Sequence, residues 1–376
     1  MTVASELTFR QALIAAGDSV RRSFAAHVPL YICTALVAAT MVAVGLVYRL
    51  PSHLGSGFFF LGMIGEAAVL IGAAIALREL VRLYRGGTHA NPLVTMGRRL
   101  LASAMAGDRV GNLVHGLLTF TPMMMIFTAL KVDIAHMNPF SWDETFMRLG
   151  REIGFGHPSW QLLQPLFGYP PITTALSYAY GLWFPAMFGC LFWQLSRPHH
   201  DEVRAQFLLA FAFAWFFGGF VIATIFSSAG PCFYGHLVAG ADPYAPLLHY
   251  LRETRQHWPV WIVDAQDDLW RAYLSGDGDI EGISAMPSMH VMIATLLALL
   301  GWRVNRHVGM GFAVFAVIIF VSSIVLGWHY SIDGFAGAAL ALGFWWVAGK
   351  LTRHWAEFCN RQGAALPVAG GGEAVA

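Results

Sequence analysis

The chain has 376 residues, of which 12% are charged and 57% are apolar, and its formal net charge is +1. Charged residues are about half as frequent as in an average soluble protein. This excludes a disordered chain, a coiled coil and a nucleic-acid-binding protein, which all need dense charge. An ordinary soluble globule would also need a more charged surface. The composition therefore predicts a protein whose outer surface faces lipid.

Apolar segments long enough to cross a bilayer recur along the chain after a more polar start. Residues 6–27 mix apolar and charged positions, which is typical of an amphipathic helix on the membrane surface. A spanning helix needs about 20 apolar residues. Eight segments approach this length: 28–48, 58–77, 113–130, 172–195, 205–227, 288–302, 308–328 and 334–350. The sequence thus predicts an all-α polytopic membrane helix bundle, with about six core spans, two N-terminal spans and an amphipathic N-terminal helix.

The same pattern predicts how the chain is divided. Residues 1–112 are expected to form a peripheral part, made of the amphipathic helix, two spans and an interfacial connector over residues 86–112. Residues 113–355 form the main membrane domain. Residues 356–376 are small and Gly-rich, so we expect a disordered tail.

The basic residues predict the orientation of the spans. With a cytoplasmic N-terminus, most of the 23 Lys and Arg residues fall in inner segments, although the outer loops are longer. This is the positive-inside bias, and it places both termini in the cytoplasm. Two long loops, residues 131–171 and 228–287, then lie outside. Both are rich in Trp and Tyr, which suit the headgroup layer.

A first polar cluster stands where the 228–287 loop enters the next span. Pro287 suits the first turn of a helix, because its missing N–H would be unpaired there anyway. The free N–H groups of such a turn favour a phosphate. Ser288 can add a hydroxyl donor, and His290 can supply a proton. We therefore expect an anion site at the outer end of this span.

A second cluster, with His329, Tyr330 and Asp333, lies between the last two spans on the same outer face. His329 and Asp333 share one face if this stretch is helical. A carboxylate bonded to one imidazole nitrogen fixes the tautomer and leaves the other nitrogen as a nucleophile. With His290 as general acid, this set suits phosphoryl transfer through a phosphohistidine. The alternative is structural: a satisfied interfacial His290 and a His–Asp pair that only caps a helix.

These motifs resemble those of a known family. M-P-S-M-H at 286–290 and H-Y-S-I-D at 329–333 are similar to the P-S-x-H and H-Y-x-x-D motifs of the inositol phosphorylceramide synthase branch of the type-2 phosphatidic acid phosphatase superfamily. Sphingomyelin synthases are also similar to this branch. The likeness covers roughly residues 160–350. It implies a six-helix core in the 113–355 domain, an outward-facing site without metal or cofactor, His329 as nucleophile, Asp333 as its partner and His290 as acid/base.

The chain departs from the phosphatase branch of this family at two basic positions. Cys190 stands where that branch has the Lys of its K-x6-R-P motif, and Arg197 of the following Arg-Pro falls on the inner face. Ser323 stands where an Arg precedes the second His. The segment 227–234 resembles the A-P-P stretch of the synthase branch but holds no cation. These absences favour the synthase-like branch.

A phosphate in a dry site still needs positive charge. In the outer loop Arg252, Arg255 and Arg271 are the candidates to bind it, with Lys131 next. Two intramembrane polar residues, Glu66 and His115, belong to no matched motif, and we expect them to pair with each other or to line a cavity. The four cysteines have no zinc-type spacing, so no metal site is expected.

Three functional hypotheses follow. The first is a lipid phosphotransferase of the bacterial inner membrane with its site facing the periplasm. Its partners would be lipids: a phospholipid or lipid-linked phosphodiester as donor, and a hydroxyl-bearing acceptor such as a ceramide. The second is a lipid phosphate phosphatase, in which water is the acceptor. The third is a non-catalytic transporter or scaffold that keeps a polar pocket.

Overall fold

The computed structural model describes residues 9–49, 57–86, 91–276 and 282–362, and they form helices without a strand. This confirms the predicted all-α polytopic bundle. Within these residues six helices are long and apolar enough to cross a membrane: Arg10–Tyr48, Arg109–Val132, Pro170–Leu195, Glu202–Ile225, Arg306–Val325 and Ser331–Arg361. A shorter apolar helix, Met289–Val304, packs against the last two of them.

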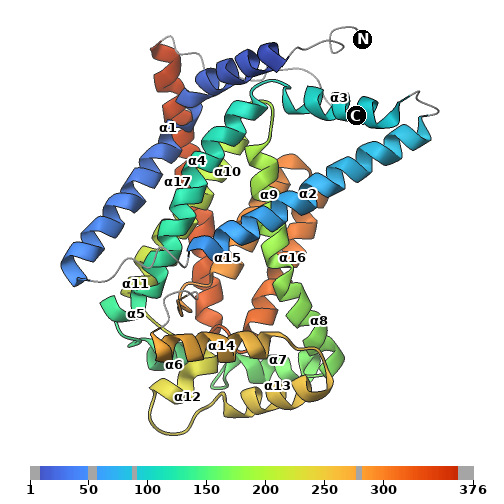
Figure 1. Ribbon diagram of the computed structural model, residues 1–376. Coiled ribbons are helices and arrows are strands. Elements are labelled where there is room, and N and C mark those ends of the chain that lie inside the picture. The colour runs from blue at the N-terminus through green and yellow to red at the C-terminus, as the bar shows by residue number, and fades with distance from the viewer. Residues whose placement is uncertain (1–8, 50–56, 87–90, 277–281, 363–376) are drawn as a thin grey trace.

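The helices of the main domain stand roughly side by side (Figure 1). Their bounds are α4 (Arg109–Val132), α8 (Pro170–Gly181), α9 (Trp183–Leu195), α10 (Glu202–Phe213), η2 (Ala214–Ile222), α11 (Ala223–Ile225), α15 (Met289–Val304), α16 (Arg306–Val325) and α17 (Ser331–Arg361). The predicted 205–227 span is one helix whose middle part, η2, is a π-helix. Such wide turns are rare and frequently lie at functional sites.

The two predicted outer loops fold into short helices that gather at one end of the bundle, the lower end in Figure 1. The first loop holds α5 (Ile134–Met137), α6 (Asp143–Ile153) and α7 (Ser159–Phe167). The second holds η3 (Pro231–Phe233), α12 (Tyr234–Leu237), α13 (Ala245–His257) and α14 (Ile262–Ser275). Both loops therefore cover the same end, where the two polar motifs also lie.

The N-terminal part differs in one respect from the prediction. It holds α1 (Phe9–Tyr48), α2 (Gly57–Arg85) and α3 (Pro92–Ala104). The expected surface helix and the first span are one helix, α1, with Pro29 inside it. Proline lacks the N–H that would bond four residues back, and this accounts for the bend of α1 in Figure 1.

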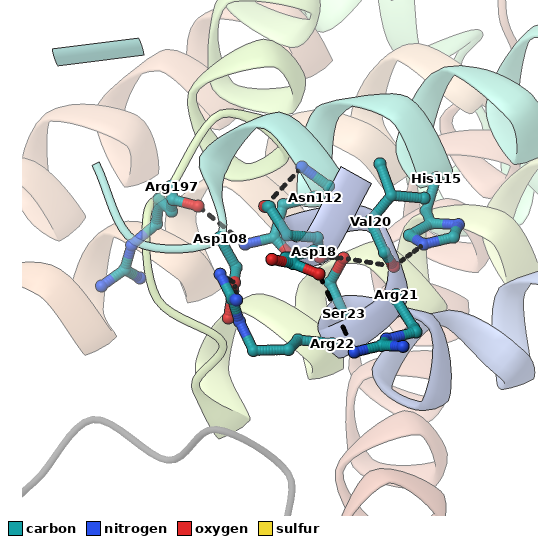
Figure 2. Close-up of polar contacts among 11 residues, drawn as sticks. Asp18, Val20, Arg21, Arg22, Ser23, Asp108, Asn112, His115 and Arg197 are labelled. Carbon is teal, nitrogen blue, oxygen red and sulfur yellow. Dashed lines mark hydrogen bonds and ion pairs between the residues drawn. The ribbon is translucent and has the colours of Figure 1, made fainter. Parts of the chain in front are cut away.

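Polar contacts fix α1 to the start of α4. Arg22 forms an ion pair with Asp108 at 2.9 Å, and the backbone N–H of Gly111 donates to Ser19 Oγ at 3.0 Å. A Cβ at Gly111 would lie only 2.4 Å from the Ser19 carbonyl oxygen, so this approach requires glycine. The imidazole of His115 also bonds to α1, through Val20 O at 2.8 Å (Figure 2).

His115 completes this contact with a second bond, between its Nδ1 and the Tyr31 hydroxyl at 2.8 Å. Both ring nitrogens of His115 are thus bonded to α1. The expected partner, Glu66, has a side chain outside the described residues. His115 therefore serves to dock α1 on α4.

The end of α17 lies beside the first part of α1, at the end of the bundle away from the short helices (Figure 1). Trp355 Nε1 donates to Ala25 O at 2.9 Å. Helix α17 continues to Arg361 and so passes residue 356, where we expected the tail to begin. Residues 363–376 of that predicted tail lie outside the described residues. The N-terminal part of α1 and the C-terminal part of α17 therefore lie at the same end of the bundle.

The starts of α15 and α17 pack directly on each other. Ser288 N donates to Asp333 O at 3.0 Å. A Cβ at Gly337 would lie 2.5 Å from the Ser288 carbonyl oxygen. Gly337 is therefore the residue that lets the two motif-bearing helix starts touch.

We predict that Gly337→Ala destabilises the fold by about 1–3 kcal/mol, because the added methyl group must push α15 away from α17. Thermal unfolding in detergent measures this change. Gly343→Ala in the same helix is the matched control, since a Cβ there meets no atom within 4 Å. An unchanged Tm for Gly337→Ala would show that this contact is not tight.

Candidate active site

The two predicted motifs open into one cavity of about 280 Å³ at the end of the bundle covered by the short helices. His290 and His329 both line it, together with Lys131 from the end of α4. The remaining wall is mostly apolar, and α4, α9, η2 and the residues just before α14 and α17 contribute aromatic side chains to it: Phe127, Trp183, Phe184, Trp215, Trp261 and Trp328. The cavity is thus apolar, with two imidazoles and an ammonium group at its wall.

His329 and Asp333 meet as the sequence predicts, although the local structure differs. His329 Nδ1 lies 3.4 Å from Asp333 Oδ2, and the two side chains are 7% and 0% exposed. The stretch is not helical at His329, because α17 begins at Ser331. Asp333 instead reaches back over the helix start, where its Oδ2 also accepts from Tyr330 N at 2.9 Å. The carboxylate faces Nδ1, which leaves Nε2 as the free nitrogen of a neutral imidazole.

The start of α15 corrects the expectation for Pro287. Helix α15 begins at Met289 with Ser288 as its N-cap, so Pro287 precedes the cap instead of occupying the first turn. Serine is among the preferred N-cap residues, since its hydroxyl can accept an N–H of the first turn. The Ser288 hydroxyl does so from Val291 N at 3.4 Å. Pro287 lines the cavity, whereas Ser288 is fully buried behind it.

His290 lies in the first turn of α15 and is held between two aromatic rings. The rings of Tyr180 and Trp183 each lie 4.2 Å from its ring centroid. Trp183 Nε1 also donates to the His290 carbonyl oxygen at 3.0 Å. The centroids of His290 and His329 are 6.3 Å apart. The two histidines are therefore fixed close to each other at one wall of the cavity.

Asp143, which no sequence motif indicates, ties the outer loops to the second motif. Its buried carboxylate accepts from Ala229 N at 2.9 Å, from Gly230 N at 2.8 Å and from the Tyr330 hydroxyl at 2.8 Å. Burial raises the pKa of the Asp143 carboxyl, and these three donors oppose that shift. Asp143 lies at the start of a short helix with no motif around it, so no sequence signal could have singled it out.

The same hydrogen bonds position the 227–234 segment. Ala229 lines the cavity, and Ser228 O accepts from Ala285 N at 2.8 Å just before the first motif. Tyr330 contacts Asp143 through its hydroxyl and does not line the cavity. The segment that resembles the A-P-P stretch therefore connects both motifs through backbone bonds.

The predicted outer-loop cations do not reach the cavity wall. Arg255 pairs with Asp264, Arg271 pairs with Asp268, and Arg252 is exposed beside a separate small pocket. The described residues of the cavity wall include Lys131 and no arginine. The indole N–H of Trp328 is buried without a hydrogen-bond partner among these residues. Lys131 and Trp328 thus bring N–H donors to the same cavity wall as the two histidines.

Two features bear on what the cavity can hold. The π-helix η2 contributes Trp215 and Gly219 to its wall, and a Cβ at Gly219 would lie 2.9 Å from a ring atom of Phe127. In the described part of the chain, no group of three or more His, Cys, Asp or Glu side chains could hold a metal ion. The chemistry available here is that of two imidazoles, one carboxylate and one ammonium group.

We predict that Asp143→Asn destabilises the protein by about 1–3 kcal/mol, because an amide cannot accept all three hydrogen bonds and places an N–H group against a backbone donor. Tyr330→Phe removes one of the three donors and should cost less, about 0.5–1.5 kcal/mol. Thermal unfolding in detergent gives both values. Equal losses for the two variants would contradict the central role of the carboxylate.

Comparison with known proteins identifies the family of the chain. A family model described as the PAP2 superfamily matches residues 144–347. These residues include His290, His329 and Asp333, whereas Asp143 lies just before the matched range. No curated protein and no solved structure matches the chain. Since the family match covers more than half of the 376 residues, the protein belongs to the PAP2 superfamily and is a membrane phosphatase or phosphotransferase of that type.

Proposed function

We propose that the protein is a lipid phosphotransferase, similar to the inositol phosphorylceramide synthase branch, that works through a phosphohistidine. The observation that carries the proposal is the arrangement of His290 and His329 at one apolar cavity, with the Asp333 carboxylate behind His329. Ser288 and Tyr330 then act as positioning residues, and Pro287 forms part of the wall. The domain of residues 113–355 carries the reaction.

The first half of the reaction forms the covalent intermediate. His329 Nε2 attacks the phosphorus of the donor, so that a P–N bond forms and the P–O bond to the leaving alcohol breaks. His290 gives its proton to the leaving oxygen. Asp333 stabilises the positive charge that develops on the His329 ring, since it faces Nδ1 at 3.4 Å. A neutral lipid or alcohol leaves the cavity.

The second half transfers the phosphoryl group. His290, now neutral, takes the proton of an acceptor hydroxyl, the new P–O bond forms, and the P–N bond breaks. Water in place of the alcohol would make the same protein a phosphatase. The mainly apolar wall favours a lipid hydroxyl as acceptor, because apolar side chains exclude water from the intermediate.

The charge of the cavity favours a phosphodiester donor over a phosphate monoester. A diester carries one negative charge, whereas a monoester carries nearly two at neutral pH. Lys131 is the one Lys or Arg side chain among the described residues of the wall. One ammonium group and the Trp328 N–H match a monoanion better than a dianion in a site with few other donors.

The first test is a product analysis with purified protein. Phospholipids labelled at phosphorus are supplied with and without ceramide or other alcohol acceptors. We predict labelled acceptor as the main product, and a loss of at least about 10³-fold in rate for His329→Ala, because the nucleophile is gone. His136→Ala, an exposed histidine of the same end, is the control. Free phosphate from a monoester, or a water-soluble phosphomonoester from a diester, as the sole labelled product would assign a hydrolase. Unchanged activity of His329→Ala would exclude a phosphohistidine.

We place phosphate binding on Lys131 ahead of the three loop arginines. Lys131→Gln should raise KM by about tenfold or more, because it removes the charge from the cavity wall. Arg255→Gln should change KM little, since Arg255 is paired with Asp264 away from the cavity. Lys350→Gln, at the far end of α17, controls for the loss of a positive charge. A larger effect for Arg255 than for Lys131 would reverse this assignment.

We further propose that the cavity faces the periplasm of a bacterial inner membrane and that both termini are cytoplasmic. The basic residues and the common location of the α1 and α17 ends support this. Native Cys232 and Cys359 are both buried, so introduced cysteines are the better probes. An impermeant thiol reagent added outside should label Arg271→Cys and not Arg361→Cys. Labelling of Arg361→Cys alone would invert the orientation.

A further inference from the structure

A second cavity, of about 320 Å³, lies at the opposite end of the bundle between α1, α10 and α17. Its polar wall contains Arg204, His27 and His200, and its apolar wall contains Leu30, Leu208 and Trp355. Along α17, the 20 residues from Asp333 to Arg353 span about 30 Å at about 1.5 Å per residue. This is close to the thickness of the hydrocarbon layer, about 30 Å. The two cavities are therefore separated by about one membrane thickness.

Arg204 is the centre of this second cavity and is only 1% exposed. Its Nε donates to Gln194 O at 2.7 Å, its Nη1 contacts His200 Nδ1 at 3.2 Å, and its Nη2 contacts His27 Nε2 at 3.0 Å. Among the described residues no carboxylate contacts this guanidinium group. A buried cation without such a partner is costly, which makes this arrangement a candidate binding site.

Hydrogen bonds fix the protonation of both histidines. His27 Nδ1 lies 2.8 Å from Ser23 O and must carry the proton, so its Nε2 accepts from Arg204. His200 Nδ1 likewise accepts from Arg204, which leaves the proton of the neutral ring on Nε2. Burial, with Arg204 next to it, lowers the pKa of His200 to about 4. Both imidazoles are therefore neutral at pH 7 and do not repel an anion or compensate the arginine.

Three carboxylates also line the cavity, and each forms its ion pair with an arginine other than Arg204. These pairs are Asp201 with Arg197 at 2.7 Å, Glu202 with Arg353 at 2.9 Å, and Glu357 with Arg361 at 3.6 Å. Each Nη atom of Arg204 keeps a second hydrogen, and His200 keeps its Nε2–H. The polar centre thus presents one net positive charge and several N–H donors.

We propose that this cavity binds the phosphate group of an anionic phospholipid from the leaflet opposite the active site. A guanidinium group and a neighbouring N–H match phosphate oxygens in charge and geometry. The apolar wall of α10 and α17 suits the glycerol and acyl part of the lipid. His27 lies outside the family match of residues 144–347. The N-terminal helix α1 therefore completes a lipid site that the family-matched segment alone does not contain.

The test measures lipid-dependent thermal stability of the full chain in detergent, in the His329→Ala background so that turnover does not consume lipid. Phosphatidylglycerol should raise Tm, because a ligand that binds only the folded state stabilises it. Phosphatidylcholine should have little effect. Arg204→Gln should raise the phosphatidylglycerol concentration for half-maximal shift at least tenfold. Ala205→Trp, which obstructs the cavity and leaves Arg204 in place, should do the same, and Arg271→Gln at the other end should not.

Inorganic phosphate distinguishes the two sources of the anion. A shift with phosphatidylglycerol and none with inorganic phosphate supports the lipid. An equal shift with inorganic phosphate, lost in both cavity variants, supports the phosphate chemistry and assigns a free phosphate as ligand. The proposal is overturned if phosphatidylglycerol and phosphatidylcholine act alike, or if folded Arg204→Gln and Ala205→Trp proteins respond like the parent.

Discussion

One close backbone contact holds the proposed active site together. The N–H of Ser288, at the cap of α15, donates to the carbonyl oxygen of Asp333 in the first turn of α17. Gly337 permits the approach, because any side chain there would collide with the Ser288 carbonyl group. His290 follows the first of these positions by two residues, and His329 precedes the second by four. The distance between the two imidazoles is therefore set by the packing of two helix starts.

A second set of hydrogen bonds attaches the outer loops to this part of the structure. Asp143 bonds to the 227–234 segment and to Tyr330, so both long outer loops are fastened to the start of α17. The aromatic side chains around the histidines leave few polar groups in the wall. A phosphohistidine formed here would be protected from water. Exclusion of water favours phosphoryl transfer to a lipid hydroxyl over hydrolysis.

The sequence was sufficient for the long helices of the bundle and for the pairing of His329 with Asp333, because long apolar segments and a four-residue spacing are local signals; the short helices of the outer loops were not predicted. It could not show the partners that tertiary packing supplies. Tyr180 and Trp183, which hold His290, lie more than 100 residues away in the chain. Asp143 stands in no motif. Pro287 was predicted in the first turn of the helix, whereas it precedes the N-cap, since Ser288 is the better cap.

The phosphate-binding residues show the same limit. Three arginines of one loop were the natural candidates by sequence, since that loop precedes the first motif. In the structure Arg255 and Arg271 are paired with acidic residues of their own region, while Lys131 approaches the cavity from α4. Which cation reaches a site depends on how distant helices pack, and single-sequence patterns do not contain that information.

We assign the role of nucleophile to His329, and trapping the phosphohistidine intermediate tests this assignment most directly. A donor phospholipid labelled at phosphorus is mixed with the protein without acceptor, and the denatured protein is digested and analysed by mass spectrometry. We predict an acid-labile phosphoryl adduct on the peptide that contains residue 329, and no adduct in the Asp333→Asn or His329→Ala protein. An adduct on His290, or turnover without any adduct, would contradict it.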